Sequence, residues 1–126
     1  MKITPMLYVD QVEPSMKFWE RLGFTAPVTV PDGDKIGFAI LVKDNVELML
    51  QSRHSMGDDR PKFMQYTQAG LNLYVEVQDF AGLQKRMQGA DIVEPVRTTF
   101  YGMQEIVVRE PGGNLVVFAA RAPQKQ

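Results

Sequence analysis

The chain has 126 residues, of which 44% are hydrophobic, and its 14 basic and 15 acidic side chains give a net charge of -1. This length predicts a single domain over residues 1–126 with a small core. The mixed charge gives no reason to expect binding to nucleic acid or to an anionic membrane. Because the chain has no cysteine, disulfides, thiolate metal sites and a cysteine nucleophile are excluded. We see no signal-peptide pattern and no apolar run long enough to cross a bilayer, and therefore expect a cytoplasmic protein.

The first segment with regular structure is predicted over Ile3–Val9, as a strand. Pro5 cannot donate a hydrogen bond to a neighbouring strand, which favours an edge position. A helix is predicted over Glu13–Leu22, and Gly23 is suited to end it. The positions that follow the helical period i, i+3, i+4, i+7 are Ser15, Phe18, Trp19 and Leu22. We expect this stripe to be buried core.

A short strand over Thr25–Val30 and a turn over residues 31–34 lead into a hairpin. Its strands are predicted over Lys35–Lys43 and Val46–Gln51. Alternation in the second strand gives an aliphatic face, expected to meet the helix, and a mixed face of Glu47, Met49 and Gln51. The face of Phe38 is not fixed by this pattern. Residues 52–68 form a long polar loop, of the kind that often serves as a lid or binding loop.

The second half repeats this order. A strand is predicted over Gly70–Val77, and Asp79 is a good N-cap for a helix that reaches Gln88. Its buried stripe would be Phe80, Leu83 and Met87. After a strand over Ile92–Thr98 comes a hairpin around the turn of residues 111–114, where Pro presets φ and the glycines accept positive φ. The apolar run 115–119 predicts a strand that is buried on both faces.

Each half therefore reads as β-α-β-β-β, an internal repeat over residues 1–51 and 69–120 that is joined by the loop 52–68. The predicted fold class is α+β, with two such modules forming curved mixed sheets around a cup. The strand faces turned away from the helices combine polar and soft apolar side chains, which is the composition of a small-molecule site. The residues predicted to bind a ligand are Tyr8, Phe38, Glu47, Met49, Asn72, Tyr74, Tyr101, Met103 and Glu105.

The two carboxylates of this set, Glu47 and Glu105, would need a cationic or hydrogen-bonding partner if they are partly buried. They would recognise a basic or polyhydroxyl ligand, or act as a general base. The alternative for Glu105 is a structural ion pair with Arg109 or Arg97. No cysteine, Ser–His pair or phosphate-binding loop supplies a nucleophile, and we predict no catalytic residue.

Three motifs follow one another along the chain: Tyr8-Val9-Asp10, Ser15-x-x-Phe18-Trp19-x-x-Leu22-Gly23-Phe24 and Arg109-Glu110-Pro111-Gly112-Gly113-Asn114-x-x-x-Phe118. In these motifs the chain resembles the vicinal oxygen chelate superfamily, which contains glyoxalase I, bleomycin-resistance proteins and extradiol dioxygenases. The resemblance covers nearly the whole chain and is closest to the bleomycin-resistance branch. It implies a homodimer in which each cup is built from modules of two chains.

The resemblance also implies where a metal would be bound, because metal-dependent members use one side chain from each of four strands. Aligned on the motifs, these positions are Thr4, Glu47, Asn72 and Val117. Only Glu47 is a competent ligand for Zn or Fe. The single histidine, His54, lies in the loop and is expected to be a surface residue. We predict no metal and no cofactor.

The predicted function is metal-independent binding of a small organic molecule in the cup. The resemblance suggests sequestration of an antibiotic, although the near-neutral charge argues against bleomycin itself, which is cationic. One alternative is a glyoxalase-like lyase, isomerase or epimerase that uses Glu47 or Glu105 as its base. Another is an interaction module with a vestigial cup.

Overall fold

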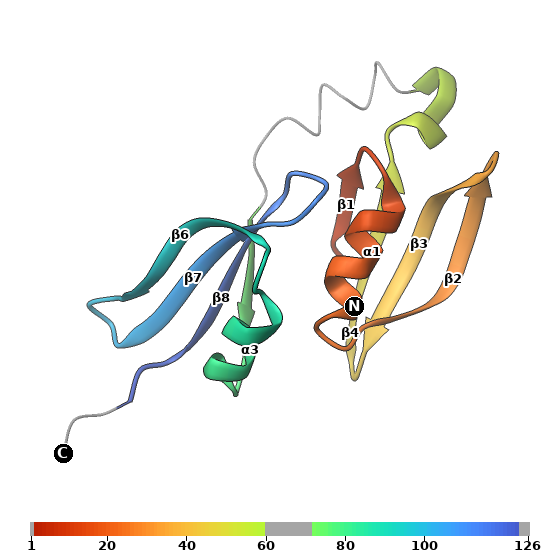
Figure 1. Cartoon of the computed structure of the whole chain (residues 1–126). Coiled ribbons are helices and arrows are strands. Elements are labelled where there is room, and N and C mark those ends of the chain that lie inside the picture. The colour runs from red at the N-terminus through yellow and green to blue at the C-terminus, as the bar shows by residue number, and fades with distance from the viewer. Residues whose placement is uncertain (1, 60–71, 124–126) are drawn as a thin grey trace. The chain divides into compact units, whose positions relative to one another are not determined.

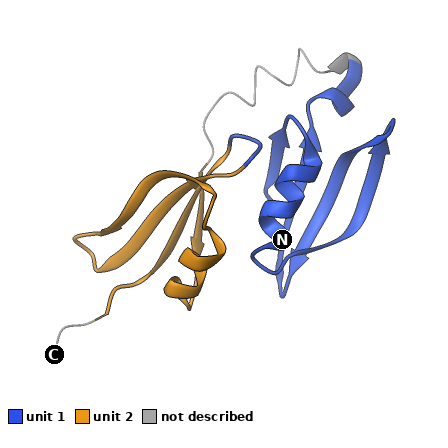
Figure 2. Cartoon of the chain, in the orientation of Figure 1, with its two compact units in different colours: residues 1–70, 111–113 blue, residues 71–110, 114–126 orange. Residues whose placement is uncertain are grey.

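The computed structural model describes residues 2–59 and 72–123, and the chain divides into two compact units (Figure 2). Unit 1 contains residues 1–70 and 111–113, and unit 2 contains residues 71–110 and 114–126. In its described part, each unit has one four-stranded sheet and one α-helix (Figure 1). The predicted α+β class and the repeated β-α-β-β-β order are confirmed.

Unit 1 has the strand order β1-β4-β3-β2, in which β1 is parallel to β4 and the other pairs are antiparallel. Its elements are β1 (Met6–Val9), α1 (Val12–Glu20), β2 (Thr25–Asp32), β3 (Lys35–Lys43), β4 (Val46–Ser52) and the 3-10 helix η1 (His54–Asp59). The first part of the predicted loop 52–68 thus has regular structure. Its part from residue 60 on lies outside the described residues, as does the predicted start of the next strand at Gly70.

The prediction that the first strand begins at Ile3 is wrong, because β1 begins at Met6. Pro5 has no N–H with which to extend the ladder. Its carbonyl oxygen still accepts a hydrogen bond from the Met49 N–H at 2.9 Å. This backbone hydrogen bond holds the described chain before Met6 beside β4, and Thr4 is not a strand residue.

The helix α1 buries the predicted stripe and contacts β3 and β4. It begins at Val12 and ends at Glu20, somewhat earlier than predicted. Gly23 has φ of 96°, a left-handed conformation that suits glycine and turns the chain away from the helix. The Lys43 ammonium donates to the Leu22 carbonyl oxygen at 2.7 Å and so satisfies a group at this end.

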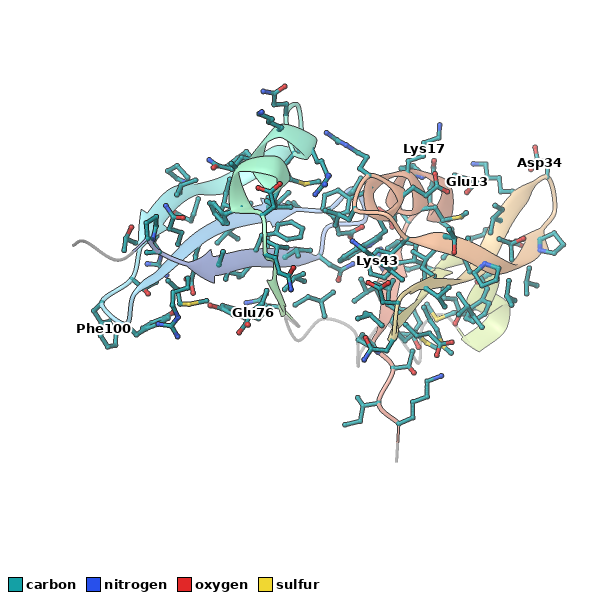
Figure 3. The ribbon with its side chains drawn as sticks, turned by 90° about the horizontal axis from the view of Figure 1, so that it is seen from below. Glu13, Lys17, Asp34, Lys43, Glu76 and Phe100 are labelled. Carbon is teal, nitrogen blue, oxygen red and sulfur yellow. The ribbon has the colours of Figure 1, made fainter. Side chains whose placement is uncertain are left out.

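Unit 2 has the strand order β5-β8-β7-β6, again with one parallel pair, β5 and β8, and two antiparallel pairs. The helix α3 lies on one face of this sheet (Figures 1 and 3), and Phe80, Leu83 and Met87 are buried as predicted. The helix ends at Arg86 and not at Gln88, so that Met87 is its C-cap residue. The elements of the unit are β5 (Asn72–Glu76), α3 (Phe80–Arg86), β6 (Asp91–Thr98), β7 (Met103–Arg109) and β8 (Leu115–Arg121).

The strand β8 is less buried than predicted. Val116 and Phe118 are fully buried, whereas Leu115 and Val117 on the other face are only half-buried. The prediction of burial on both faces holds only from Phe118 onward, where Ala119 is also buried. One face of this sheet is therefore left partly open over β8.

The predicted N-cap of α3 is present, because the Asp79 carboxylate accepts a hydrogen bond from the Gly82 N–H at 2.9 Å. Asp79→Ala removes this acceptor and is expected to lower the free energy of unfolding by about 1 kcal/mol. Urea denaturation followed by circular dichroism measures the change. Gln78→Ala, an exposed neighbour, is the matched control, and an equal effect of the two substitutions would contradict a capping role.

Candidate functional site

The face of the first sheet that α1 does not cover carries two rows of half-exposed side chains. The strand register aligns Tyr8, Gln51, Phe38 and Val30 in one row. The neighbouring row is Met6, Met49, Ile40 and Val28. The structure thus fixes the face of Phe38, which the sequence left open, and brings it into line with Tyr8. Ile40, Val28 and Val30 also belong to this open face and were missed. Residues 38–42 of β3 are all apolar, so alternation does not separate the faces of this strand, and the face of β2 follows from its pairing with β3.

Glu47 lies further along the same face, in register with Val42 on β3. Its carboxylate forms an ion pair with the Lys2 ammonium, and its side chain is 21% exposed. The negative charge of Glu47 therefore has a partner within unit 1. The ion pair between Glu47 and Lys2 is a structural one, and it lies at the edge of the two apolar rows.

In the second sheet, the uncovered face brings three of the predicted residues together. Tyr74 comes from β5, Glu105 from β7, and Tyr101 from the turn between β6 and β7. Met103 lies two residues before Glu105 on β7 and is half-buried. Asn72 is exposed and lies in register with Leu115 at the far end of β5, so it does not join this cluster.

Glu105 is the centre of the cluster and is only 4% exposed. Its Oε2 atom accepts hydrogen bonds from the Tyr74 hydroxyl at 2.7 Å and the Tyr101 hydroxyl at 2.8 Å. Its Oε1 atom lies 3.5 Å from Nη2 of Arg97, a long contact. Both tyrosines remain half-exposed. We refer to Glu105, Tyr74, Tyr101 and Arg97 as the Glu105 cluster.

The hydrogen bonds set the protonation states in this cluster. The bond from Tyr74, followed by that from Tyr101, holds the pKa of Glu105 below its ordinary value of 4.5. The same bond to Glu105 raises the pKa of Tyr74 from 10.0 to about 12. At neutral pH the carboxylate is therefore ionised and the phenol keeps its proton, so that Tyr74 is the donor and Glu105 the acceptor.

This shift makes the stability depend on pH. Since the pKa of Glu105 is lower in the folded chain, its ionised form contributes stability above pH 4.5, and that contribution is lost as the pH falls through the folded value. Melting temperatures of the native chain and of Glu105→Gln, measured from pH 7 downward, should therefore converge in this acidic range. A constant difference between them over the whole range would contradict the proposed linkage.

Of the two ion pairs considered for Glu105, the structure selects Arg97, because Arg109 lies 3.4 Å from the Asp91 carboxylate instead. Arg97 and Glu105 are direct partners across the β6–β7 ladder. Two register shifts in β6, between Ile92 and Glu94 and between Glu94 and Arg97, precede this pair. Counted from Ile92 opposite Val108 without these shifts, Arg97 would lie opposite Met103.

Unit 1 also contains a cavity of about 450 Å³ that the sequence did not reveal. It lies between the end of β1, the start of α1 and the β2–β3 turn, with Glu13 and Asp34 labelled in Figure 3. Three of its acidic groups have partners: Asp10 pairs with Arg53 at 2.8 Å, Asp32 Oδ2 lies 2.6 Å from His54 Nδ1, and Glu13 accepts a hydrogen bond from the Ile36 N–H at 3.1 Å. His54 is 82% exposed, as expected for a surface residue. The residues lining this cavity are Asp10, Gln11, Glu13, Asp32, Gly33, Asp34, Lys35, Ile36, Ser52 and His54.

The family model of the Glyoxalase/Bleomycin resistance protein/Dioxygenase superfamily matches residues 3–118. The chain belongs to this superfamily. None of the curated proteins compared with the chain matches it.

Several solved structures share the fold. TioX from Micromonospora sp. ML1 has a TM-score of 0.69 and 21% identity, with 100% of both chains covered. The bleomycin-binding protein from Streptomyces verticillus, solved with copper(II)-bleomycin, has a TM-score of 0.61 and 21% identity, covering 98% of this chain and 97% of that one. The bleomycin resistance determinant of the transposon Tn5 has a TM-score of 0.65 and 18% identity, covering 96% and 98%. At these identities the likeness is one of fold.

The four positions at which the resemblance implies metal ligands offer a poor donor set. Glu47 is the one carboxylate, and it is paired with Lys2. Thr4 precedes β1, and Val117 has no donor atom and lies in register with Tyr74. Within the described part of the chain, no group of three or more His, Cys, Asp or Glu side chains is arranged to hold a metal ion. These residues do not fit a Zn or Fe centre. Nor does any helix of the described residues have the length and apolarity to span a membrane.

Proposed function

We propose that this member of the superfamily binds a small organic molecule on its open sheet faces without the help of a metal. The observation that carries the proposal is the Glu105 cluster, in which a buried, ionised carboxylate is flanked by two half-exposed tyrosine rings. Such a polar group among aromatic surfaces is what orients a ligand in a small-molecule site. The rows that contain Tyr8, Phe38 and Met49 supply soft apolar surface of the same kind.

The same proposal includes a cytoplasmic homodimer in which modules of two chains complete each cup. Its support is the exposure of apolar side chains on the open face of unit 1, where Met6, Val28 and Val30 are 37%, 43% and 48% exposed. A contiguous apolar surface of this type is stabilised when a partner or a ligand covers it.

Sequestration of an antibiotic is the biological role that we propose for this binding. The superfamily membership and the copper(II)-bleomycin complex of the Streptomyces verticillus protein support it. The net charge of -1 provides little long-range attraction for a strongly cationic drug. We therefore propose a ligand other than bleomycin.

The enzyme alternative has a specific observation in its favour, namely a carboxylate that touches two phenols in one cluster. The protonation states count against it, because a carboxylate with a lowered pKa is a weak base and a phenol with a pKa of about 12 is a weak acid at neutral pH. An enzyme with Glu105 as its base would lose about 10²-fold or more in turnover in Glu105→Gln with binding largely kept. A binding protein would lose affinity instead.

Native mass spectrometry of the untagged protein tests the proposal directly, since one spectrum reports the oligomer, any retained metal and any co-purified organic molecule. A metal-free dimer is expected, and a thermal-shift panel of antibiotics then searches for the ligand. A true ligand at 100 times its Kd adds roughly 2.7 kcal/mol to the stability. A stoichiometric transition metal would refute metal independence. A protein that no compound stabilises and that carries no organic mass would favour the vestigial interaction module.

A further inference from the structure

The two oxygens of the Glu105 carboxylate differ in their partners. Oε2 accepts two short hydrogen bonds from phenols, whereas Oε1 has, among the residues that the structure describes, one long contact of 3.5 Å to Arg97. The Arg97 side chain is 68% exposed. At 3.5 Å, and with the guanidinium largely in solvent, this ion pair is a weak one. The guanidinium therefore covers Oε1 without being firmly held there.

We propose that Arg97 occupies the place of a ligand's cationic group, and that the ligand of the Glu105 cluster is a planar aromatic cation. Its positive nitrogen would replace the Arg97 guanidinium at Oε1, while its ring would lie against the exposed parts of Tyr74 and Tyr101. This inference rests on the proposed binding function and names the chemical class of the ligand.

Three features of the cluster favour this class over a neutral or anionic ligand. A buried carboxylate gains most from a partner of opposite charge, because its surroundings screen the attraction less than water does. The faces of tyrosine rings also attract cations and stack on flat rings. Phe100 extends the aromatic surface at the β6–β7 turn (Figure 3), where it is fully exposed with its ring 5.0 Å from that of Tyr101.

The opposite possibility is that Arg97 is the ligand-binding group and recognises an anion. The exposed guanidinium would then keep its contact with Glu105 and use its remaining donors for the ligand. The two possibilities predict opposite effects of Arg97→Gln. Removing a competing cation strengthens the binding of a cationic ligand, whereas removing the binding group weakens that of an anion.

The test uses three probes that share one ring system and differ in charge at pH 8: 9-aminoacridine as the cation, acridine as the neutral compound and acridine-9-carboxylate as the anion. Each is titrated into the full chain by isothermal calorimetry. The cation is expected to bind more tightly than the other two by at least about tenfold, the factor that a difference of 1.4 kcal/mol represents. This preference should disappear in Glu105→Gln.

Two further variants keep the test decisive if Glu105→Gln does not fold. Arg97→Gln changes an exposed side chain and should raise the affinity for 9-aminoacridine about two- to fivefold, the range expected when a weak ion pair is lost. Tyr101→Leu removes a ring face and should lower it by a similar factor. Gln78→Ala, at an exposed position of the same unit outside the cluster, is the matched control and should leave the affinity unchanged.

The outcomes separate the inference from the proposed function. Equal or tighter binding of the neutral or anionic probe overturns the cationic class but leaves small-molecule binding in place. If none of the three probes binds but native mass spectrometry finds an organic molecule, the cationic class is likewise overturned and small-molecule binding stays in place. If no probe binds and no compound of the wider panel stabilises the protein, both proposals fail.

Discussion

Trp19→Ala is expected to lower the free energy of unfolding by about 3–5 kcal/mol, the range for removal of a large buried aromatic side chain. Trp19 is 1% exposed on the buried face of α1. Its ring meets Phe18 and Phe24 edge to face, with centroids 5.3 and 5.5 Å away. The substitution removes this packing and leaves a cavity that the surrounding β-sheet can fill only in part.

Urea denaturation measures this loss, and circular dichroism must follow it because Trp19 is the only tryptophan. Phe100→Ala is the matched control, since it removes an aromatic ring that is 100% exposed and should change the stability by no more than about 0.5 kcal/mol. Similar losses in the two variants would contradict the assignment of Trp19 to the core.

Trp19→Phe refines the same experiment. The indole Nε1 atom is buried and finds no hydrogen-bond partner among the described residues. Phenylalanine gives up part of the packing but also removes this unpaired donor, and an unpaired buried donor is itself destabilising. We expect a loss well below half that of Trp19→Ala. A loss as large as that of alanine would mean that the indole N–H is bonded in solution.

The second large effect is expected at Glu110, where Glu110→Ala should lower the free energy of unfolding by about 1–3 kcal/mol. Glu110 is 1% exposed, and its Oε1 atom accepts hydrogen bonds from the Asn114 backbone N–H at 2.9 Å and from the Asn114 side-chain amide at 2.8 Å. The Glu110 N–H in turn donates to the Asn114 carbonyl oxygen at 2.9 Å. Alanine leaves two donors of Asn114 without this acceptor at the β7–β8 turn.

Glu110→Gln is the control for this prediction because its amide oxygen can still accept while the charge is lost. It should retain more than half of the stability that alanine loses, as measured by the same urea titration. If Glu110→Ala and Glu110→Gln were equally destabilising, the charge of Glu110 and not the hydrogen bonds that it accepts would stabilise the turn.

The Glu110 result bears on how the sequence is read. Glu110 and Asn114 belong to the motif that carries the family resemblance, and in the structure they are hydrogen-bonded to each other across the turn. The motif predicted the fold correctly because these hydrogen bonds stabilise the turn. It carried no information about the ligand, which depends on residues of the open faces.

Helices and caps were the most predictable parts of the chain, because their signals are local. The buried stripe with Phe18 and Trp19 and the cap at Asp79 follow from spacing and residue type alone. The side of β3 on which Phe38 lies was not predictable, since residues 38–42 are apolar without alternation. Pairing with β4 decides it, through a tight turn in which Asp44 takes φ of 53°.

The Glu105 cluster was predictable in its members but not in its contacts. Tyr74, Tyr101 and Glu105 were all candidates from their strand faces, yet their hydrogen bonds depend on the side-by-side placement of β5, β8 and β7. The sequence left Arg97 and Arg109 as equal partners for the carboxylate. Pairing between β6 and β7 decides between them, and irregularities of this kind leave little trace in a strand sequence.

The two register shifts of β6 also bear on how related chains can diverge. They add two residues to β6 relative to β7 and so bring Arg97 opposite Glu105. If β6 became regular without losing residues, the guanidinium would move along the ladder to Met103 and leave the carboxylate to other neighbours, whereas deletion of the two extra residues between Ile92 and Arg97 would keep Arg97 opposite Glu105. The regularity of an edge strand can therefore alter ligand preference while every residue in contact with the ligand stays the same. The irregularities of β6, and not its length alone, are accordingly the natural variation to watch when members of this superfamily are sorted by what they bind.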